Sequence, residues 1–403
     1  MFIALLLLLG HAQAAPAEDY LEWVDGAVAP AATPRAAGRP VRTAPLELAP
    51  SSEAADEAKI PGYRFAAEVF GEIAEQVRAG SFPVDVERIG TSIQGRPLWA
   101  FHAQGEGPVT RRVLVFGGIH AMEWIATEVA LELLLDLTVT APPPGVRVTV
   151  IPLLNPDGRA RVERDLLVGE ENYRRGNAAN VDLNRDFAVN REPRAVWRAI
   201  LPGYYRSSRA PLSQPETQAL DALADRERYH RAASLHSFGG FFYVPWAGRA
   251  HRVPAEDRRE LWALGRAMEG AWGTRAYRTR QLGRWAFFFR AHGAEIDHLY
   301  GRYGTRAFLI EVTRSGIQPL HPRTWKWGFR SYNPRRERRY LKHRDRTVQS
   351  LHALIAHPEL PTEEQSRLDG RHGLPPVLDG DEVPSWRERR QQRRQQRQAK
   401  RGR

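Results

Sequence analysis

The sequence predicts an α/β fold, a single globular domain in which a mixed, mostly parallel, twisted sheet carries helices on both faces. Two observations indicate this fold class. Short apolar runs rich in strand-forming residues alternate along the chain with longer segments whose apolar residues recur at helical spacing. Hydrophobic residues make up 42% of the chain, which is enough for a sizeable core, and we find no internal repeat.

The individual elements follow from these local patterns. Strands are predicted where short apolar runs end at turn-forming residues: residues 84–89, 98–102, 113–116, 146–154, 232–236 and 306–312. Helices are predicted where apolar residues return every three or four positions: residues 65–77, 124–137, 214–225, 258–272 and 339–355. Asn155-Pro156-Asp157-Gly158 is a strong turn sequence, and the charged, aperiodic residues 159–191 are expected to form a long loop of the kind that is usually functional or disordered.

Composition divides the 403 residues into four segments. Residues 1–14 contain an apolar run followed by Ala12-Gln13-Ala14, which is typical of a signal peptide, so we expect export to a periplasmic or extracellular space. Residues 15–60, rich in Ala and Pro, are expected to be a linker or short pro-segment. Residues 61–358 form the predicted domain, and residues 359–403 a disordered basic tail. No further segment is apolar and long enough to predict a transmembrane helix.

The net charge of +12 is concentrated in the tail. Residues 385–403 carry nine basic residues against one acidic residue, Glu388, which leaves a charge of +4 for the rest of the chain. An anionic partner would therefore bind the tail rather than the domain.

His120 and Glu123 lie between the predicted strand at residues 113–116 and the helix that follows it. Their spacing lets both side chains face the same way, and ligand sites of open α/β sheets lie at the carboxyl ends of strands. The chain has no cysteine, so a zinc ion would be held by His and carboxylate ligands. A His-x-x-Glu pair alone is weak evidence, because His292 and Glu295 form a second one.

Several motifs, in order, resemble those of the zinc carboxypeptidases of the pancreatic carboxypeptidase A type. The resemblance covers about residues 62–358, most of the predicted domain. Each motif is weak alone, and their shared order makes the resemblance strong. The motifs are His120-Ala-Met-Glu123-Trp124, Asn155-Pro156-Asp157-Gly158, Asn172-Tyr-Arg174-Arg175, Asp182-Leu-Asn184-Arg185, His236-Ser237 and Glu311-Val-Thr-Arg.

The resemblance implies one zinc ion per chain, held by His120, Glu123 and His236. Zinc lowers the pKa of a bound water to about 7. Glu311 is then implied as the general base, and Arg174 as the residue that stabilises the oxyanion. Only the alignment favours Arg174 over Arg175. Asp182 is implied to orient the ring of His120.

The same resemblance implies how a peptide substrate would bind. Asn184 and Arg185 are expected to bind its terminal carboxylate. Phe289 is expected to cover the site where the family has a tyrosine, and Met122 replaces an arginine between the first two ligands. Ile296 occupies the position that sets specificity, which favours an apolar or aromatic C-terminal residue, with Phe288, Ala291 and Leu309 beside it. The neighbouring Glu295 leaves a basic residue open as the alternative.

The function expected from the sequence is an exported metallocarboxypeptidase that removes C-terminal residues from peptides and acts as a monomer. Two alternatives stay open. One is a zinc peptidase or amidase acting on bacterial cell-wall peptides. The other is a non-enzymatic protein that binds nucleic acid or an anionic surface through its Arg/Gln tail. Without the other motifs, His236 would be a hydrogen-bonded core histidine, whereas a buried Glu311 favours function because an unpaired buried carboxylate is costly.

Overall fold

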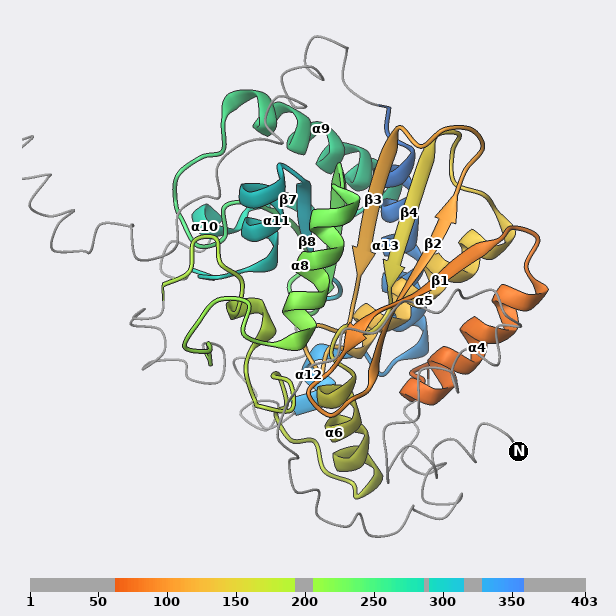
Figure 1. The fold of residues 1–403 in the computed structure, drawn as a ribbon, viewed down its shortest axis with the longest axis vertical. Helices are drawn as coiled ribbons and strands as arrows, with labels where there is room; N and C mark the ends of the chain where they lie inside the picture. Colours follow the sequence, from red (N-terminus) through yellow and green to blue (C-terminus); the bar gives the residue numbers. More distant parts are fainter. Residues whose placement is uncertain (1–61, 193–205, 286–289, 315–327, 359–403) are drawn as a thin grey trace, which may run out of the picture.

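The computed structural model describes residues 62–192, 206–285, 290–314 and 328–358 (Figure 1). The predicted signal peptide, linker and basic tail lie outside the described residues, as do Phe288 and Phe289. Among the described helices, none combines the length and apolar character needed to cross a membrane.

An eight-stranded mixed sheet forms the centre of the structure, in the order β1-β2-β4-β3-β5-β8-β6-β7. Neighbours from β4 through β3 and β5 to β8 are parallel, as are β6 and β7, while the remaining neighbours are antiparallel. The strands are β1 (Val84–Thr91), β2 (Pro97–Gln104), β3 (Arg111–Phe116), β4 (Val146–Ile151), β5 (Arg231–His236), β6 (Phe241–Val244), β7 (Arg278–Gln281) and β8 (Arg306–Glu311).

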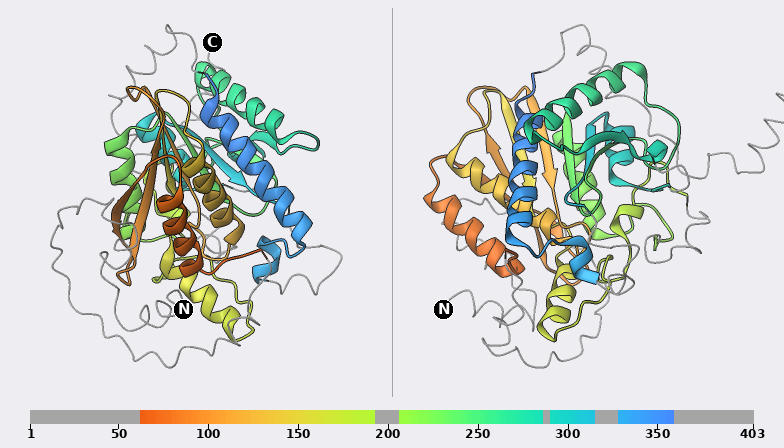
Figure 2. Two further views of the ribbon diagram at one scale, coloured as in Figure 1. Left: turned by 90° about the vertical axis from the view of Figure 1, so that its right-hand side faces the viewer. Right: turned by 180° about the vertical axis from the view of Figure 1, so that it is seen from behind.

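Helices cover both faces of this sheet (Figure 2). One face carries α4 (Ala66–Ala79), α5 (Trp124–Val139), α9 (Ala255–Trp272) and α13 (Glu337–Ala356). The other carries α8 (Pro215–Glu227) and α11 (Glu295–Tyr303). Short elements complete the described part: α6 (Pro156–Leu167), the 3₁₀ turn η2 (Leu183–Arg185), α10 (Leu282–Trp285) and α12 (Gly328–Tyr332). The predicted fold class is confirmed.

The core is divided between these two faces by the alternation of side chains along each strand. In β3, Val113 and Val115 pack into the apolar cluster under α5, α9 and α13. Leu114 and Phe116 pack into the cluster under α8 and α11. All four are fully buried, which explains why this strand has a continuous apolar sequence rather than an alternating one.

The largest difference from the predicted elements is α6, which begins where a turn and a long loop were predicted. Asn155 is its N-cap and accepts a hydrogen bond from the Gly158 backbone N–H at 2.9 Å. Pro156 occupies the first helical position, and Asp157 lies in the positively polarised first turn. These residues are therefore a helix start as well as a turn sequence. The short β6, β7, α11 and α12 were also not predicted.

Candidate metal centre

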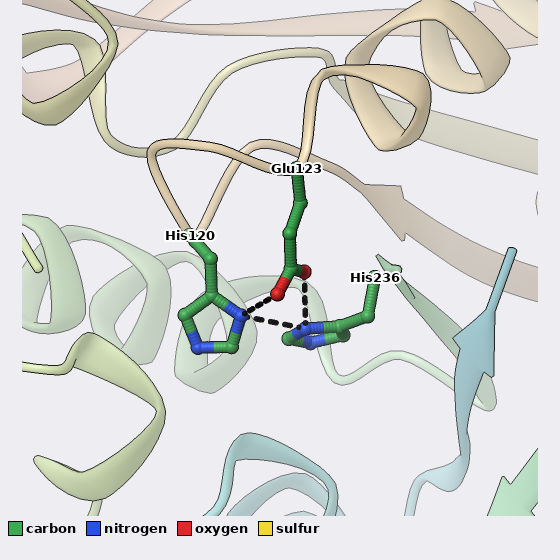
Figure 3. Close-up of side chains that lie close together, drawn as sticks. All are labelled: His120, Glu123 and His236. Carbon is green, nitrogen blue, oxygen red and sulfur yellow. Dashed lines mark hydrogen bonds and ion pairs between the residues drawn. The ribbon is translucent and has the colours of Figure 1, made fainter. Parts of the chain in front are cut away.

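His120, Glu123 and His236 converge on one point at the carboxyl ends of the central parallel strands (Figure 3). One ligand atom from each residue lies within 4.8 Å of the others, and all three residues are buried. Nδ1 of His120 is 2.9 Å from Glu123 Oε1 and 3.0 Å from His236 Nδ1. His236 Nδ1 is in turn 3.1 Å from Glu123 Oε2. Two imidazole nitrogens and a carboxylate thus face one another, as they would around a shared cation.

The sheet brings these residues together. Because β3 and β5 are parallel neighbours, the loop carrying His120 and the end of β5 at His236 lie at the same edge. The turn after β3 is tight: a Cβ at Gly117 would lie 2.7 Å from the Ala126 carbonyl oxygen, so only glycine fits. Glu123 is the N-cap residue of α5, and its Oε2 also accepts a hydrogen bond from the Ser237 backbone N–H at 3.0 Å.

A buried asparagine from a distant segment holds the start of α5 in place. Asn333 donates through its side-chain amide to the Met122 carbonyl at 2.7 Å and accepts from the Ile125 backbone N–H at 3.0 Å. Asn333 therefore holds the backbone before and after Glu123. No local signal in the sequence marks Asn333, because its role depends on how α12 packs against α5.

Each imidazole has a carboxylate on its outer nitrogen. His120 Nε2 is 3.1 Å from Asp182 Oδ1, and His236 Nε2 is 2.9 Å from Glu295 Oε1. A carboxylate accepts the Nε2 proton, and this leaves the Nδ1 lone pair directed at the centre of the cluster. Asp182 therefore lies where it was predicted, beside His120.

The electrostatics of the cluster fit a divalent cation. Burial opposes protonation of His236, yet the carboxylates of Glu295 and Glu123 outweigh it and raise its pKa to about 10. The carboxylates Glu123, Asp182, Glu295 and Glu311 interact here with two guanidiniums, those of Arg175 and Arg185. Surroundings that favour a positive charge on His236 would also favour a cation held between the two imidazoles and Glu123. Nitrogen and oxygen donors without thiolate are a ligand set that zinc accepts.

Glu311, the last residue of β8, lies beside the cluster. It pairs with His236 in the ladder between β5 and β8. Its side chain is half-buried, and Oε2 is shielded from solvent without a hydrogen-bond partner among the described residues. Burial raises the pKa of Glu311 to about 8, and the negative charge of Glu123 adds to the rise. A carboxyl group with this pKa and a free oxygen has the properties of an acid–base catalyst.

The structure corrects the placement of the predicted oxyanion residue. Arg174 forms an ion pair with Asp165, with its Nε 2.7 Å from Oδ2. Arg175 faces the cluster instead, with Nε 2.7 Å from Asp182 Oδ2 and an NH1 group 3.3 Å from Glu123 Oε1. The Arg175 backbone carbonyl also accepts from the Ala121 N–H at 3.2 Å, which connects this residue to the segment that carries His120 and Glu123.

The predicted substrate-binding residues lie close to the same edge of the sheet. Asn184 and Arg185 form the buried turn η2 directly after Asp182, and the Arg185 guanidinium donates to the Asn184 backbone carbonyl. Asn184 Oδ1 accepts from the Glu295 backbone N–H at 3.1 Å. Ile296 is fully buried in an apolar cluster that also contains Ala291 and Leu309. Phe289, the remaining predicted contact, is outside the described residues.

The second His-x-x-Glu pair does not act as a pair. His292 faces the Asn190 carbonyl, 3.3 Å from its Nδ1, and burial lowers the pKa of His292 to about 4. Glu295, by contrast, contacts His236. The sequence motif therefore contained one residue of the site, although its partner in the motif belongs elsewhere.

Comparisons with known protein families and proteins find relatives of this chain. A family model described as zinc carboxypeptidase matches residues 74–326. The uncharacterized protein YqgT of Bacillus subtilis is 30% identical over 197 residues, which are 41% of this chain and 52% of the relative. Inactive metallocarboxypeptidase ECM14 of Saccharomyces cerevisiae is 24% identical over 264 residues, 59% of this chain and 60% of the relative. The match thus spans between half and three fifths of these curated relatives.

Solved structures share the fold. Bovine thrombin-activatable fibrinolysis inhibitor, solved with tick carboxypeptidase inhibitor, superposes with a TM-score of 0.57 at 20% identity, covering 73% of this chain and 97% of that chain. Carboxypeptidase A of Helicoverpa armigera gives a TM-score of 0.55 at 18% identity, covering 74% of this chain and 75% of that chain. At these identities the likeness establishes the architecture of the sheet and its helices.

Proposed function

Because the chain belongs to the zinc carboxypeptidase family, we propose that it is an exported zinc-dependent metallocarboxypeptidase that hydrolyses the C-terminal peptide bond of peptides. The observation that carries the proposal is the convergence of His120, Glu123 and His236, with Glu311 beside them. A yeast relative is described as inactive, so family membership does not by itself make a chain active. Activity is proposed here from the residues that this chain carries.

His120, Glu123 and His236 would hold one zinc ion, their Nδ1 and carboxylate atoms facing the centre of the cluster. When bound, zinc supplies Lewis acidity, which polarises a carbonyl and lowers the pKa of water to about 7. Glu311 takes the proton of the attacking water as its oxygen bonds to the carbonyl carbon. Glu311 then delivers that proton to the peptide nitrogen as the C–N bond breaks, so that the leaving group is a neutral amine.

Arg175 replaces Arg174 as the residue proposed to stabilise the oxyanion, since it is the arginine that faces the cluster. Its guanidinium is held by Asp182, so little reorganisation is needed when negative charge develops. Asn184 and Arg185 are proposed to bind the terminal carboxylate, for which a guanidinium offers two parallel donors. Ile296, in its apolar surroundings, is proposed to favour an apolar or aromatic C-terminal residue.

The segments outside the described residues complete the proposal. Residues 1–14 would direct export, and Phe289 would close over the bound substrate. The basic tail, residues 359–403, would serve as an accessory anchor to an anionic partner. We propose that the chain acts as a monomer.

A carboxypeptidase requires a free C-terminal carboxylate on its substrate, and this requirement tests the proposed substrate class. An N-blocked dipeptide ending in phenylalanine should be hydrolysed, and the same dipeptide with a C-terminal amide should be almost inert. Arg185→Lys should lower kcat/KM for the free acid by about 10-fold or more, because the two parallel hydrogen bonds are lost. Equal rates on acid and amide would contradict a carboxypeptidase, and faster cleavage of muropeptides would favour a cell-wall substrate.

A further inference from the structure

Glu295, the first residue of α11, approaches His236 from the side opposite the proposed metal ligands. Its Oε1 lies 2.9 Å from His236 Nε2, the ring nitrogen that points away from His120 and Glu123. The Ser234 hydroxyl lies 2.9 Å from the same nitrogen. Glu295 is fully buried, and its backbone N–H donates to Asn184 Oδ1. Its position is therefore fixed from both ends.

Two carboxylates thus hold the two histidines, but their own surroundings differ. Asp182, behind His120, accepts hydrogen bonds from the Arg175 guanidinium at 2.7 Å and from the Asn184 backbone N–H at 3.0 Å. Glu295, behind His236, has an Oε2 atom that is buried without a hydrogen-bond partner among the described residues. One carboxylate is neutralised by a guanidinium, and the other depends on its histidine.

A buried carboxylate with one unpaired oxygen destabilises a folded protein unless another charge compensates it. Packing and hydrogen bonding by themselves give no reason to keep Glu295, since glutamine has almost the same shape. A dication on the other side of the His236 ring would provide the compensation. It would make the Nε2 proton more acidic and so strengthen the hydrogen bond to the carboxylate.

We propose that Glu295 is a positioning residue for His236, which holds the ring with Nδ1 toward the metal and increases metal affinity. The proposal rests on the proposed zinc site. It extends that site by a side chain outside the ligand set, which belongs to the second His-x-x-Glu pair of the sequence.

Glu295→Gln tests the proposal, because it removes the charge and keeps the shape. Zinc affinity, measured by competition with a chromogenic chelator, should fall by about 10–100-fold. The increase in Tm on zinc loading should be smaller in the variant than in the wild type, since a ligand that binds more weakly stabilises the folded protein less at the same concentration. Glu295→Ala should weaken zinc binding at least as much.

Asp297→Asn is the matched control. Asp297 is a buried carboxylate two residues away that accepts from the Ala247 and Gly248 backbone N–H groups at 2.6 and 2.9 Å and touches none of the proposed ligands. This control should lower the Tm of both metal-free and zinc-loaded protein and leave zinc affinity unchanged. If Glu295→Gln behaves in the same way, Glu295 has a structural role only and the inference is overturned.

Asp182→Asn separates this inference from the proposed function. If the wild type binds one zinc and Asp182→Asn weakens binding, while Glu295→Gln binds zinc within twofold of the wild type, only the role of Glu295 is wrong. If the wild type binds no zinc, the metal centre and the role of Glu295 are both overturned.

Discussion

Glu311 and His236 are register partners in two neighbouring parallel strands, so the proposed base and a proposed metal ligand leave the sheet at the same level. Strands β5 and β8 pair along all six of their residues. The separation between base and ligand is therefore set by a backbone ladder in the centre of the sheet rather than by a loop. Sites built on regular elements are held more precisely than sites on loops, which suits a reaction that needs close proton transfer.

The neighbouring arginines 174 and 175 should differ sharply in their effect on catalysis. Arg175→Lys should lower kcat by about 10²–10³-fold, the usual effect of losing one donor to a developing oxyanion. Arg174→Lys should leave kcat within about twofold, since this side chain pairs with Asp165. Steady-state kinetics on zinc-loaded variants of equal Tm will check this. A larger loss in Arg174→Lys would reverse the assignment.

Asn333→Ala should destabilise the fold at the start of α5, next to Glu123. It leaves the Met122 carbonyl and the Ile125 backbone N–H buried without their partner, at about 1–3 kcal/mol for each group. Urea unfolding should show the loss, and Asn333→Asp should not recover it, because a carboxylate oxygen would face the Met122 and Phe329 carbonyl oxygens that the amide donates to. Asn172→Ala, at an exposed asparagine, is the control and should change little. If Asn333→Ala is as stable as the wild type, Asn333 does not hold the start of α5 in place.

Glu216 should make the protein less stable as pH rises. Burial of this side chain at the start of α8 raises its pKa from the usual range of a glutamate to about 7. Because the folded-state pKa is raised, its contribution to stability is fully present below about pH 4.5 and is lost as pH rises through about 7. Glu216→Gln should therefore match the wild type at pH 4.5 and exceed it by up to roughly 3 kcal/mol at pH 8.

Other groups also titrate and change the stability of both proteins. The quantity to measure is therefore the difference in the free energy of unfolding between Glu216→Gln and the wild type at each pH. Glu75→Gln, at an exposed position on α4, is the control and should show no such difference. A constant gap between Glu216→Gln and the wild type from pH 4.5 to pH 8 would show that Glu216 keeps an ordinary pKa in the fold.

The sequence was sufficient to predict the features that depend on local pattern. Apolar runs placed the central strands, and the position of His120 and His236 at strand ends indicated that they could meet. It could not distinguish Arg174 from Arg175, because adjacent arginines have the same chemistry. In the fold, the Arg175 guanidinium contacts Asp182 and Glu123, and the Arg175 carbonyl accepts a hydrogen bond from the Ala121 N–H.

Features that depend on packing between distant elements were missed. Glu295 reaches His236 because α11 packs against β5 and β8, and Asn333 reaches α5 because α12 packs against it. The start of α6 was different, since Asn155, Pro156 and Asp157 carry a recognisable N-cap pattern that is also typical of a turn. In the fold, the Asn155 side chain caps α6, so these residues begin a helix rather than an isolated turn.

The most direct test of the central claim measures zinc content and peptide hydrolysis in wild type and Glu311→Gln. Elemental analysis should find about one zinc per chain in both, since Glu311 is outside the proposed ligand set. Turnover of an N-blocked dipeptide should fall by about 10²–10⁴-fold in the variant alone, because it lacks the base. Equal turnover in the two proteins, each with its zinc, would contradict the account.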